Sequence, residues 1–328
     1  MRRSLRLLSV LLVLLLGAAA CGDDDSSSEP DRETTDDAAS EDAYPVTITH
    51  AHGETVLDAK PERIVTLNVQ WTDAVLAMGV KPVAYGLDAG SLETEPYPWQ
   101  TDAVEGVTRL DFSGTPPYEQ IAALEPDLIL TTYVGIEQPV YETLSGIAPT
   151  IGLLGDLDVD PWQDMLRVMG EVLGDTDKAD DVIAGVEGEI DALADELPGL
   201  EGKTYVMANY VEGDSIYVVA DPNDGASGLF YALGMAIDPD ILALDPGAVG
   251  RVQLSLEQAG LLDADLLAIL TQGADPSRLP GWDQLTAVQQ GTVIDFEFAD
   301  VVGLNTPSAL SLPYVIDIMR PTFVKLAG

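Results

Sequence analysis

Two glutamates occupy equivalent places in a segment that occurs twice, and their placement suggests contact with a partner. The first copy starts at Glu119 and reads EQIAALEPDLIL, and the second starts at Glu257 and reads EQAGLLDADLLA. Five of the twelve positions are identical, and the seventh is acidic in both copies. Each copy predicts a helix opened by Glu, a short acidic break and a buried apolar strand. We therefore expect two lobes of similar design, each with one Glu as a handle for the partner.

Short apolar runs bounded by turn residues predict the strands that would build these lobes. The runs alternate with helical patterns, which is typical of βαβ units and of mostly parallel sheets. Glu212-Gly213-Asp214 between two runs indicates a hairpin or an interrupted strand there. The predicted strands cover Ile64–Val69, Pro82–Gly86, Asp127–Tyr133, Thr150–Leu154, Thr204–Val211, Ser215–Ala220, Asp265–Thr271 and Thr292–Phe298.

A long segment without strand character separates the two sets of strands. Asp160 and Pro161 form a favourable N-cap and N1 pair for a helix that ends before Gly174. A second helix is predicted from about Thr176 to Leu197, and its 22 residues would span about 33 Å. The fold class is therefore α/β, with two lobes at 44–157 and 200–328 and connecting helices at 158–199. A single long helix between the lobes would allow only modest closure.

The first 43 residues have the pattern of a targeting signal followed by a tether. Arg2, Arg3 and Arg6 precede the apolar run Leu5–Leu16, and small residues then lead to Cys21, the only cysteine. This arrangement over residues 1–20 resembles the signal peptide and lipobox of bacterial lipoproteins, which implies a diacylated Cys21 at the outer face of the cell membrane. An ordinary secretory signal is the alternative. Residues 21–43 are too polar to bury a core, so we expect a disordered tether.

The chain is strongly acidic. Without residues 1–20 it has 12 Lys and Arg against 56 Asp and Glu, a net charge of about −44. Nucleic acid and anionic lipid headgroups are poor partners for such a surface. We expect a monomer that binds no nucleic acid.

Several segments in order resemble substrate-binding lipoproteins of ABC importers for ferric siderophores, whose relatives carry cobalamin and haem. The resemblance covers residues 46–326 and rests on the segments HAHGETVLDAKPERIVTLNVQWTDAVLAMGVKPVAYG (50–86), PYEQIAALEPDLILTTYVG (117–135), LSGIAPTIGL (144–153), DPWQDMLRVMGEVLG (160–174), LSLEQAGLLDADLLAIL (254–270) and LPGWDQLTAVQQGTVIDF (279–296). It implies two α/β lobes joined by one long helix, an iron(III) chelate as ligand, no cofactor and no enzymatic activity. The implied partners are a permease dimer and its ATPase subunits.

In this family one Glu on each lobe docks into arginine pockets of the permease, and the matching positions are Glu119 and Glu257. The competing interpretation is that each Glu only favours a helix start through the helix dipole, by about 0.3–1 kcal/mol. Ser255 and Gln258 already form a plausible capping box for the second copy, so Glu257 is not needed there.

The ligand is expected in the cleft between the two lobes, with its contacts beyond the carboxyl ends of the strands. A ferric siderophore has fully coordinated iron, so aromatic faces and Arg donors should hold it rather than metal ligands. For each aromatic residue ordinary packing is the alternative, and for each Arg it is a surface salt bridge. Among the loop arginines we prefer Arg251, and we favour neutral or weakly charged hydroxamate complexes. The predicted ligand contacts are Trp71, Tyr97, Trp99, Arg109, Tyr133, Tyr210 and Arg251.

Other chemistry is less well supported by the residues. His50 and His52 lie two apart without a third ligand type nearby, so we predict no metal site. Asp156, Asp158 and Asp160 mimic the start of an EF-hand, but Pro161 stands where the loop needs Gly. No nucleophile and base are paired in a motif, which argues against a hydrolase on a two-lobed frame. Cobalamin or haem stays open as a ligand.

Overall fold

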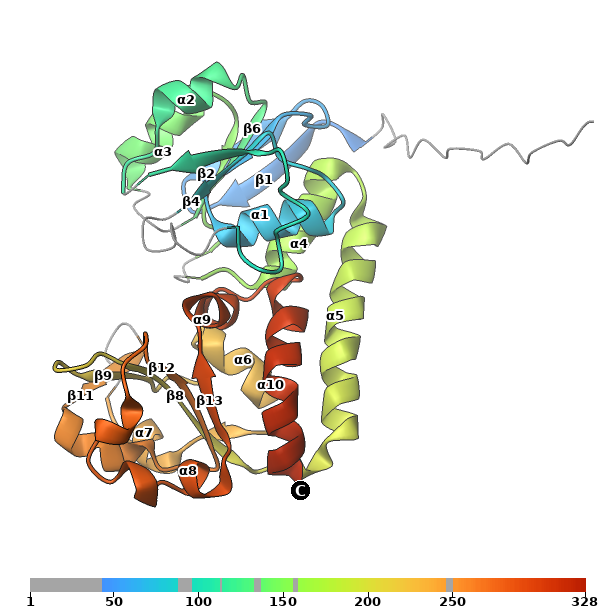
Figure 1. Ribbon diagram of the computed structural model, residues 1–328. Helices are drawn as coiled ribbons and strands as arrows, with labels where there is room; N and C mark the ends of the chain where they lie inside the picture. The colour runs from blue at the N-terminus through green and yellow to red at the C-terminus, as the bar shows by residue number, and fades with distance from the viewer. Residues whose placement is uncertain (1–42, 88–95, 113, 133–136, 156–158, 246–249) are drawn as a thin grey trace, which may run out of the picture. The chain divides into compact units, whose positions relative to one another are not determined.

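Two large β-sheets, one before and one after a pair of connecting helices in the sequence, organise the described residues of the computed structural model (Figure 1). The structure describes residues 43–87, 96–112, 114–132, 137–155, 159–245 and 250–328. All of them fall within one unit, which runs from Ala39 to Gly328. We call the sheet-bearing part before the connecting helices the N-terminal lobe and the part after them the C-terminal lobe. The predicted fold class, α/β with two lobes, is confirmed.

The N-terminal lobe contains a five-stranded parallel sheet with the order β5-β4-β3-β6-β7. A separate antiparallel hairpin, β1 and β2, precedes it. The strands are β1 (Val46–His50), β2 (Gly53–Leu57), β3 (Ile64–Thr66), β4 (Ala84–Leu87), β5 (Thr108–Asp111), β6 (Leu128–Leu130) and β7 (Thr150–Ile151), and the helices are α1 (Val69–Ala77), α2 (Tyr118–Ala123) and α3 (Gln138–Ser145).

The central strands of this sheet are buried throughout and mostly apolar because both of their faces are covered. In β6, Leu128 and Leu130 belong to one cluster of buried side chains, whereas Ile129 belongs to a second cluster on the opposite face. In β3, Ile64 and Val65 divide between the clusters in the same way. Successive residues of a strand point to opposite faces, so a continuous apolar run is what a doubly covered strand requires.

The C-terminal lobe has a mixed sheet with the order β11-β9-β8-β12-β13, and β10 pairs with β8. The predicted hairpin is confirmed, because β9 runs antiparallel to β8. The strands are β8 (Thr204–Tyr210), β9 (Ile216–Val219), β10 (Ala236–Ile237), β11 (Arg251–Leu254), β12 (Leu266–Leu270) and β13 (Val293–Phe296). The α-helices are α6 (Gly228–Ala232), α7 (Pro239–Leu242), α8 (Thr286–Gln290), α9 (Phe298–Asn305) and α10 (Ser311–Ala327), and the 3-10 helices are η3 (Pro198–Leu200), η4 (Gly225–Ser227), η6 (Leu256–Leu262), η7 (Pro276–Arg278) and η8 (Trp282–Gln284).

The duplicated segment forms the same unit in each lobe. Its first copy is α2 followed by β6, and its second copy is the 3-10 helix η6 followed by β12. The aspartate that both copies share has the same structural role in each, which accounts for one of the identical positions. Asp127 accepts hydrogen bonds from the backbone N–H groups of Glu62 and Arg63 just before β3, and Asp265 accepts one from Thr204 at the start of β8. Since β3 pairs with β6 and β8 with β12, each aspartate ties together the beginnings of two neighbouring parallel strands.

Two helices connect the lobes, as predicted: α4 (Trp162–Leu173) and α5 (Thr176–Glu196). Gly174 ends α4 with a φ of 68°, and the Asp175 carboxylate caps α5 by accepting from the Lys178 N–H. The helices approach so closely that a Cβ at Gly170 would lie 2.8 Å from the Cβ of Ala179. α5 alone is about 32 Å long, and Figure 1 shows it running beside α10.

One cluster of buried apolar side chains runs without interruption from the N-terminal lobe through α4 and α5 into the C-terminal lobe. It includes Trp71 and Leu128 on one side, Met169 and Ile183 on the connecting helices, and Tyr205 in the C-terminal sheet. Lobes that share a large apolar interface move less freely than lobes joined by a bare linker. The connection therefore favours limited closure.

Some predicted boundaries were wrong. Residues 67–69 were assigned to the first strand, but β3 ends at Thr66 and α1 starts at Val69, where the Asn68 side chain accepts from the Trp71 N–H. Asp160 was predicted to cap α4. The residue that flanks α4 is Pro161, without a side-chain hydrogen bond, and the Asp160 carboxylate instead accepts from the backbone N–H of Leu154 at 2.9 Å.

The paired aspartates yield a prediction about stability. Asp127→Ala and Asp265→Ala should each lower the free energy of unfolding by about 1–3 kcal/mol, because backbone donors lose a charged acceptor. Urea unfolding followed by tryptophan fluorescence measures the effect. Glu119→Ala, an exposed change in the same segment, is the control and should leave stability within about 0.5 kcal/mol. Equal stabilities of all three variants would contradict the assigned role.

Candidate ligand-binding site

A pocket of about 1040 Å³ lies between the connecting helices and the C-terminal lobe. This volume is at the upper end of the range for small-molecule sites. One wall comes from the start of α4 and from α5. The opposite wall comes from the turn after β9, from α6, from the start of β11 and from the α9–α10 loop. Its lining residues are Val159, Asp160, Pro161, Trp162, Gln163, Glu187, Ile190, Asp191, Asp221, Pro222, Asn223, Asp224, Gly225, Gly228, Leu229, Ala232, Gly250, Arg251, Asn305, Pro307 and Leu312.

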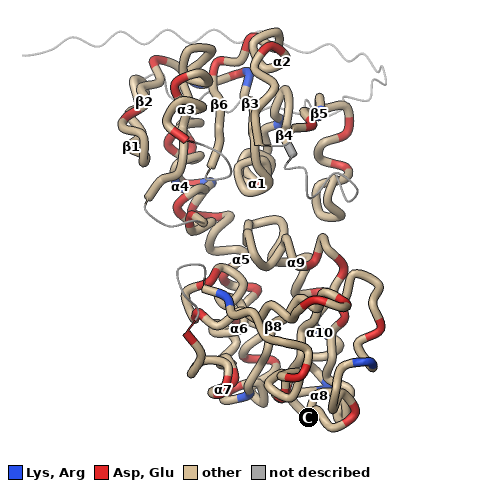
Figure 2. Tube along the Cα trace, turned by 90° about the vertical axis from the view of Figure 1, so that its left-hand side faces the viewer, with Lys and Arg blue, Asp and Glu red and all other residues tan. Residues whose placement is uncertain are grey.

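The pocket is acidic, with five carboxylates and one guanidinium among the lining residues that the structure describes. Figure 2 shows the same imbalance over both lobes, where Asp and Glu far outnumber Lys and Arg. Asp160 differs from the rest because it is only 2% exposed, and this burial raises the pKa of its carboxyl group. The carboxylates of the pocket are Asp160, Glu187, Asp191, Asp221 and Asp224.

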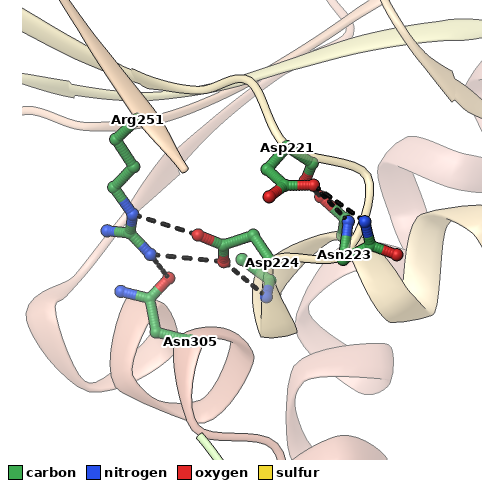
Figure 3. A network of polar contacts seen from close by, with 7 residues as sticks. Asp221, Asn223, Asp224, Arg251 and Asn305 are labelled. Carbon is green, nitrogen blue, oxygen red and sulfur yellow. Dashed lines mark hydrogen bonds and ion pairs between the residues drawn. The ribbon is translucent and has the colours of Figure 1, made fainter. Parts of the chain in front are cut away.

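Arg251 is the one predicted ligand contact that lines this pocket, and it is engaged by neighbouring side chains (Figure 3). Its Nε lies 3.2 Å from Oδ2 of Asp224, and its Nη2 donates to Oδ1 of the same carboxylate at 3.3 Å. Nη2 also donates to Oδ1 of Asn305 at 3.0 Å. Arg251 was expected in a loop, but it is the first residue of β11. The network thus joins β11, the turn after β9 and the end of α9.

The turn that carries Asp224 is held by its own side chains. Asp221 accepts from the backbone and side-chain nitrogens of Asn223 at 2.8 and 3.1 Å, and Asp224 accepts from the N–H of Ala226 at 2.9 Å. Gly250 packs against this turn with a φ of 68°, and a Cβ there would lie 3.2 Å from Cβ of Asp221. A larger residue at position 250 would therefore push the turn and Arg251 apart.

Trp71 and Tyr210 were predicted to face the ligand, but the structure places both in the core. Trp71 is 0% exposed and its Nε1 donates to the carbonyl of Thr131 at 2.8 Å. Tyr210 is 3% exposed and ends β8. Trp71 was predicted as a ligand contact because it would lie just beyond the end of the first strand, but that strand was assigned three residues too many. In α1 the same residue belongs to the run 70–75, which is buried throughout.

Tyr97 and Trp99 pack against each other and do not line the pocket. Their rings are stacked with centroids 4.8 Å apart. The Trp99 ring also lies 5.2 Å from that of Tyr314 in α10, so it bridges the two lobes. Arg109 is in the outer strand β5 and forms a salt bridge to Asp111 at 2.7 Å. Tyr133 lies outside the described residues.

Asp73 is a buried carboxyl group that links the lobes, and the sequence interpretation missed it. It accepts from Nε1 of Trp99 at 2.9 Å, from Nε2 of Gln100, and from Oγ of Ser308 in the α9–α10 loop at 2.5 Å. One turn earlier in α1, Nε2 of Gln70 donates to the carbonyl of Pro307 at 2.9 Å. Pro307 also lines the pocket, so α1 fixes one part of its wall.

Two histidines near the first hairpin show no arrangement for metal binding. Nε2 of His50 lies 2.9 Å from Oγ1 of Thr55, and burial together with His52 lowers the pKa of His50. His52 stacks on Tyr141 with ring centroids 4.3 Å apart. Within the described ranges, no three or more His, Cys, Asp or Glu side chains are grouped so that they could hold a metal ion.

The fold agrees with comparisons to known proteins. A family model described as periplasmic binding protein matches residues 64–299, which is well over half of the chain. The chain belongs to the periplasmic binding protein family.

Individual relatives cover most of this periplasmic binding protein. A probable siderophore-binding lipoprotein of Bacillus subtilis, YfiY, is 27% identical over 298 residues, covering 85% of this chain and 88% of the relative. The crystal structure of a periplasmic solute-binding protein from Mycobacterium smegmatis has a TM-score of 0.73 and 26% identity, covering 86% and 99% of the two chains. Staphylococcus aureus SirA in complex with staphyloferrin B has a TM-score of 0.67 and 25% identity, covering 86% and 98%.

The periplasmic binding protein presents Glu119 and Glu257 as exposed side chains, one per lobe. Glu119 is in the first turn of α2 and Glu257 in that of η6. The capping box predicted for the second copy is present, since the Ser255 N–H donates to Oε1 of Gln258 at 3.0 Å. Glu257 is therefore not the cap of its helix. Cys21 lies outside the described residues, and among the described helices none is long and apolar enough to cross a membrane.

The pKa of Asp73 leads to a prediction about pH. Burial raises this pKa to about 7, although hydrogen bonds from Ser308, Gln100 and Trp99 lower it. All three donors are neutral, so no cation offsets the buried charge.

Between about pH 4 and pH 7 the unfolded chain loses the Asp73 proton while the folded protein keeps it, so the folded state loses relative stability as pH rises. Wild-type protein should therefore lose up to several kcal/mol relative to Asp73→Asn over this window, at about 1.4 kcal/mol per pKa unit. Guanidinium unfolding of both proteins between about pH 4.5 and pH 8 measures this difference in stability, because that range covers most of the titration of Asp73. A difference independent of pH would contradict the elevated pKa.

Proposed function

We propose that this protein is the solute-binding component of an ABC importer for iron. It captures an iron(III)–siderophore complex in the pocket beside α4 and α5 and delivers it to a membrane permease with its ATPase subunits. It acts as a binding protein, without catalysis, at the extracytoplasmic side of the membrane. We also propose that Cys21 carries the lipid anchor and that residues 21–43 are the tether.

The observation that carries this proposal is the pocket, whose volume suits a bulky chelate. The fold that surrounds it resembles that of proteins which bind such chelates. YfiY is a probable siderophore-binding lipoprotein, and the SirA structure contains staphyloferrin B. The lining residues that the structure describes include no His. The pocket therefore offers no imidazole there to haem or cobalamin, and a chelate with fully coordinated iron needs none.

Trp162 allows a direct test of ligand binding. It lines the pocket and is 7% exposed. A ferric chelate bound beside it should quench its fluorescence, and Trp162→Phe should remove much of the quenching while leaving the affinity, measured by calorimetry, within a few-fold. Trp282→Phe, outside the pocket lining, is the matched control and should retain the quenching. Absence of binding to ferric hydroxamates, ferric catecholates and ferric carboxylates alike would overturn the proposed function.

The two exposed glutamates allow a test of delivery. Glu119→Ala/Glu257→Ala should bind the chelate with unchanged affinity but lose most uptake of radioactive iron in cells, because the permease loses its two anionic contacts. Glu54→Ala/Glu201→Ala, another exposed pair with one residue in each lobe, is the control and should transport normally. Full uptake by the first double variant would show that these glutamates are only helix-start residues.

A further inference from the structure

Arg251 is the one basic residue among the described residues that line the pocket, so the state of its guanidinium decides what charge the pocket accepts. Two of its nitrogens face the two oxygens of Asp224 at 3.2 and 3.3 Å. Two guanidinium nitrogens that face both oxygens of one carboxylate form a bidentate pair, which fixes the orientation of both groups. The charge that would attract an anionic chelate is therefore already neutralised within the protein.

Asp224 is positioned for this contact before any ligand arrives. Its side chain is 12% exposed, and its Oδ1 also accepts from the Ala226 N–H at 2.9 Å. Asn305 holds the same guanidinium from the side of α9 at 3.0 Å. Figure 3 shows Asp224 and Asn305 converging on Arg251 from two different elements. Moving Arg251 toward a ligand would leave the Asp224 carboxylate without its cation in a largely buried place, which is costly.

Apart from Arg251, the charged residues that the structure describes on the pocket wall are all acidic. Glu187 and Asp191 on α5 are exposed carboxylates, and Asp221 lies at the foot of the turn that carries Asp224. Two unit charges about 4 Å apart interact by about 1 kcal/mol in water and about 4 kcal/mol near a protein surface. A chelate with several negative charges would meet repulsion of this size from the wall, and a pendant ammonium group would meet attraction.

We infer that Asp224 determines ligand charge in this pocket: by occupying Arg251 it makes the site select neutral or cationic ferric chelates over anionic ones. This inference rests on the proposed function, since it concerns the same pocket and the same class of ligand. The favoured ligand is a ferric hydroxamate that bears a protonated amine. A ferric tris-catecholate, with its triple negative charge, is disfavoured.

A series of ligands with one iron core separates charge from shape. Ferrioxamine B carries a pendant ammonium group, its N-acetyl derivative has no net charge, and its N-succinyl derivative carries a single negative charge. Calorimetry at low and physiological salt should show that wild-type protein binds the cationic form about tenfold or more tightly than the succinylated form, a difference of about 1.4 kcal/mol or more. Added salt should reduce this ratio.

Asp224→Asn should free the guanidinium charge while its amide oxygen can still accept from Ala226, and the ratio should collapse or reverse. Asp191→Asn is an exposed change on α5 that leaves the Arg251 network intact, and it should lower the ratio by a few-fold. It tests the charge preference of the pocket even if Asp224→Asn fails to fold. Glu189→Gln, exposed on α5 but outside the pocket lining, is the control and should keep the wild-type ratio.

The outcomes distinguish this inference from the proposed function. Wild-type protein that binds the succinylated form as tightly as ferrioxamine B, or an unchanged ratio in Asp224→Asn, would overturn the charge selection alone. Failure to bind every member of the series and every other ferric chelate would overturn the proposed function and the inference with it. Preference for the cationic form that depends on Asp224 supports both.

Discussion

The apolar cluster that passes through α4 and α5 is the constraint on which the rest of the structure depends. It joins the two sheets into one core, so the lobes share buried side chains such as Trp71, Met169 and Ile183 and are more than neighbours on a tether. The polar contacts of α1 with the α9–α10 loop, through Gln70 and Asp73, lie where this core meets the pocket. A rigid frame of this kind keeps the opposite walls of a binding pocket at a fixed spacing before the ligand arrives.

The acidic residues of this protein have different roles, depending on whether they are exposed or buried. Most of the acidic residues are exposed, and each contributes little to stability because water and salt screen it. Asp73 and Asp224 differ because they are buried or nearly so and have specific donors. Asp73 uses neutral donors to join the lobes, and Asp224 uses the only guanidinium of the described pocket lining. The net charge of −41 therefore says less about the ligand than one ion pair does.

The sequence predicted the parts of the fold that depend on long apolar patterns. Continuous apolar runs identified β6 and β12 because strands covered on both faces need them. The strands β5 and β11 were missed, since TRLD and RVQL each bury only one residue fully and show no clear alternation. Arg251 was found as a pocket residue, but its partners Asp224 and Asn305 were not, because no local pattern relates residues 27 and 54 positions away. The turn at Asp221–Gly225 follows β9, which is antiparallel to β8, so the rule that ligands bind at the carboxyl ends of parallel strands does not indicate it.

The central claim is that a ferric chelate occupies the pocket between the connecting helices and the C-terminal lobe. The most direct test is an anomalous difference map, recorded at the iron absorption edge, from crystals of the protein with ferrioxamine B. Our account predicts an iron peak inside the pocket, with the chelate beside Trp162 and the Arg251–Asp224 pair intact. An iron peak outside the lining of this pocket, or a chelate bound directly by an Arg251 that has left Asp224, would contradict it.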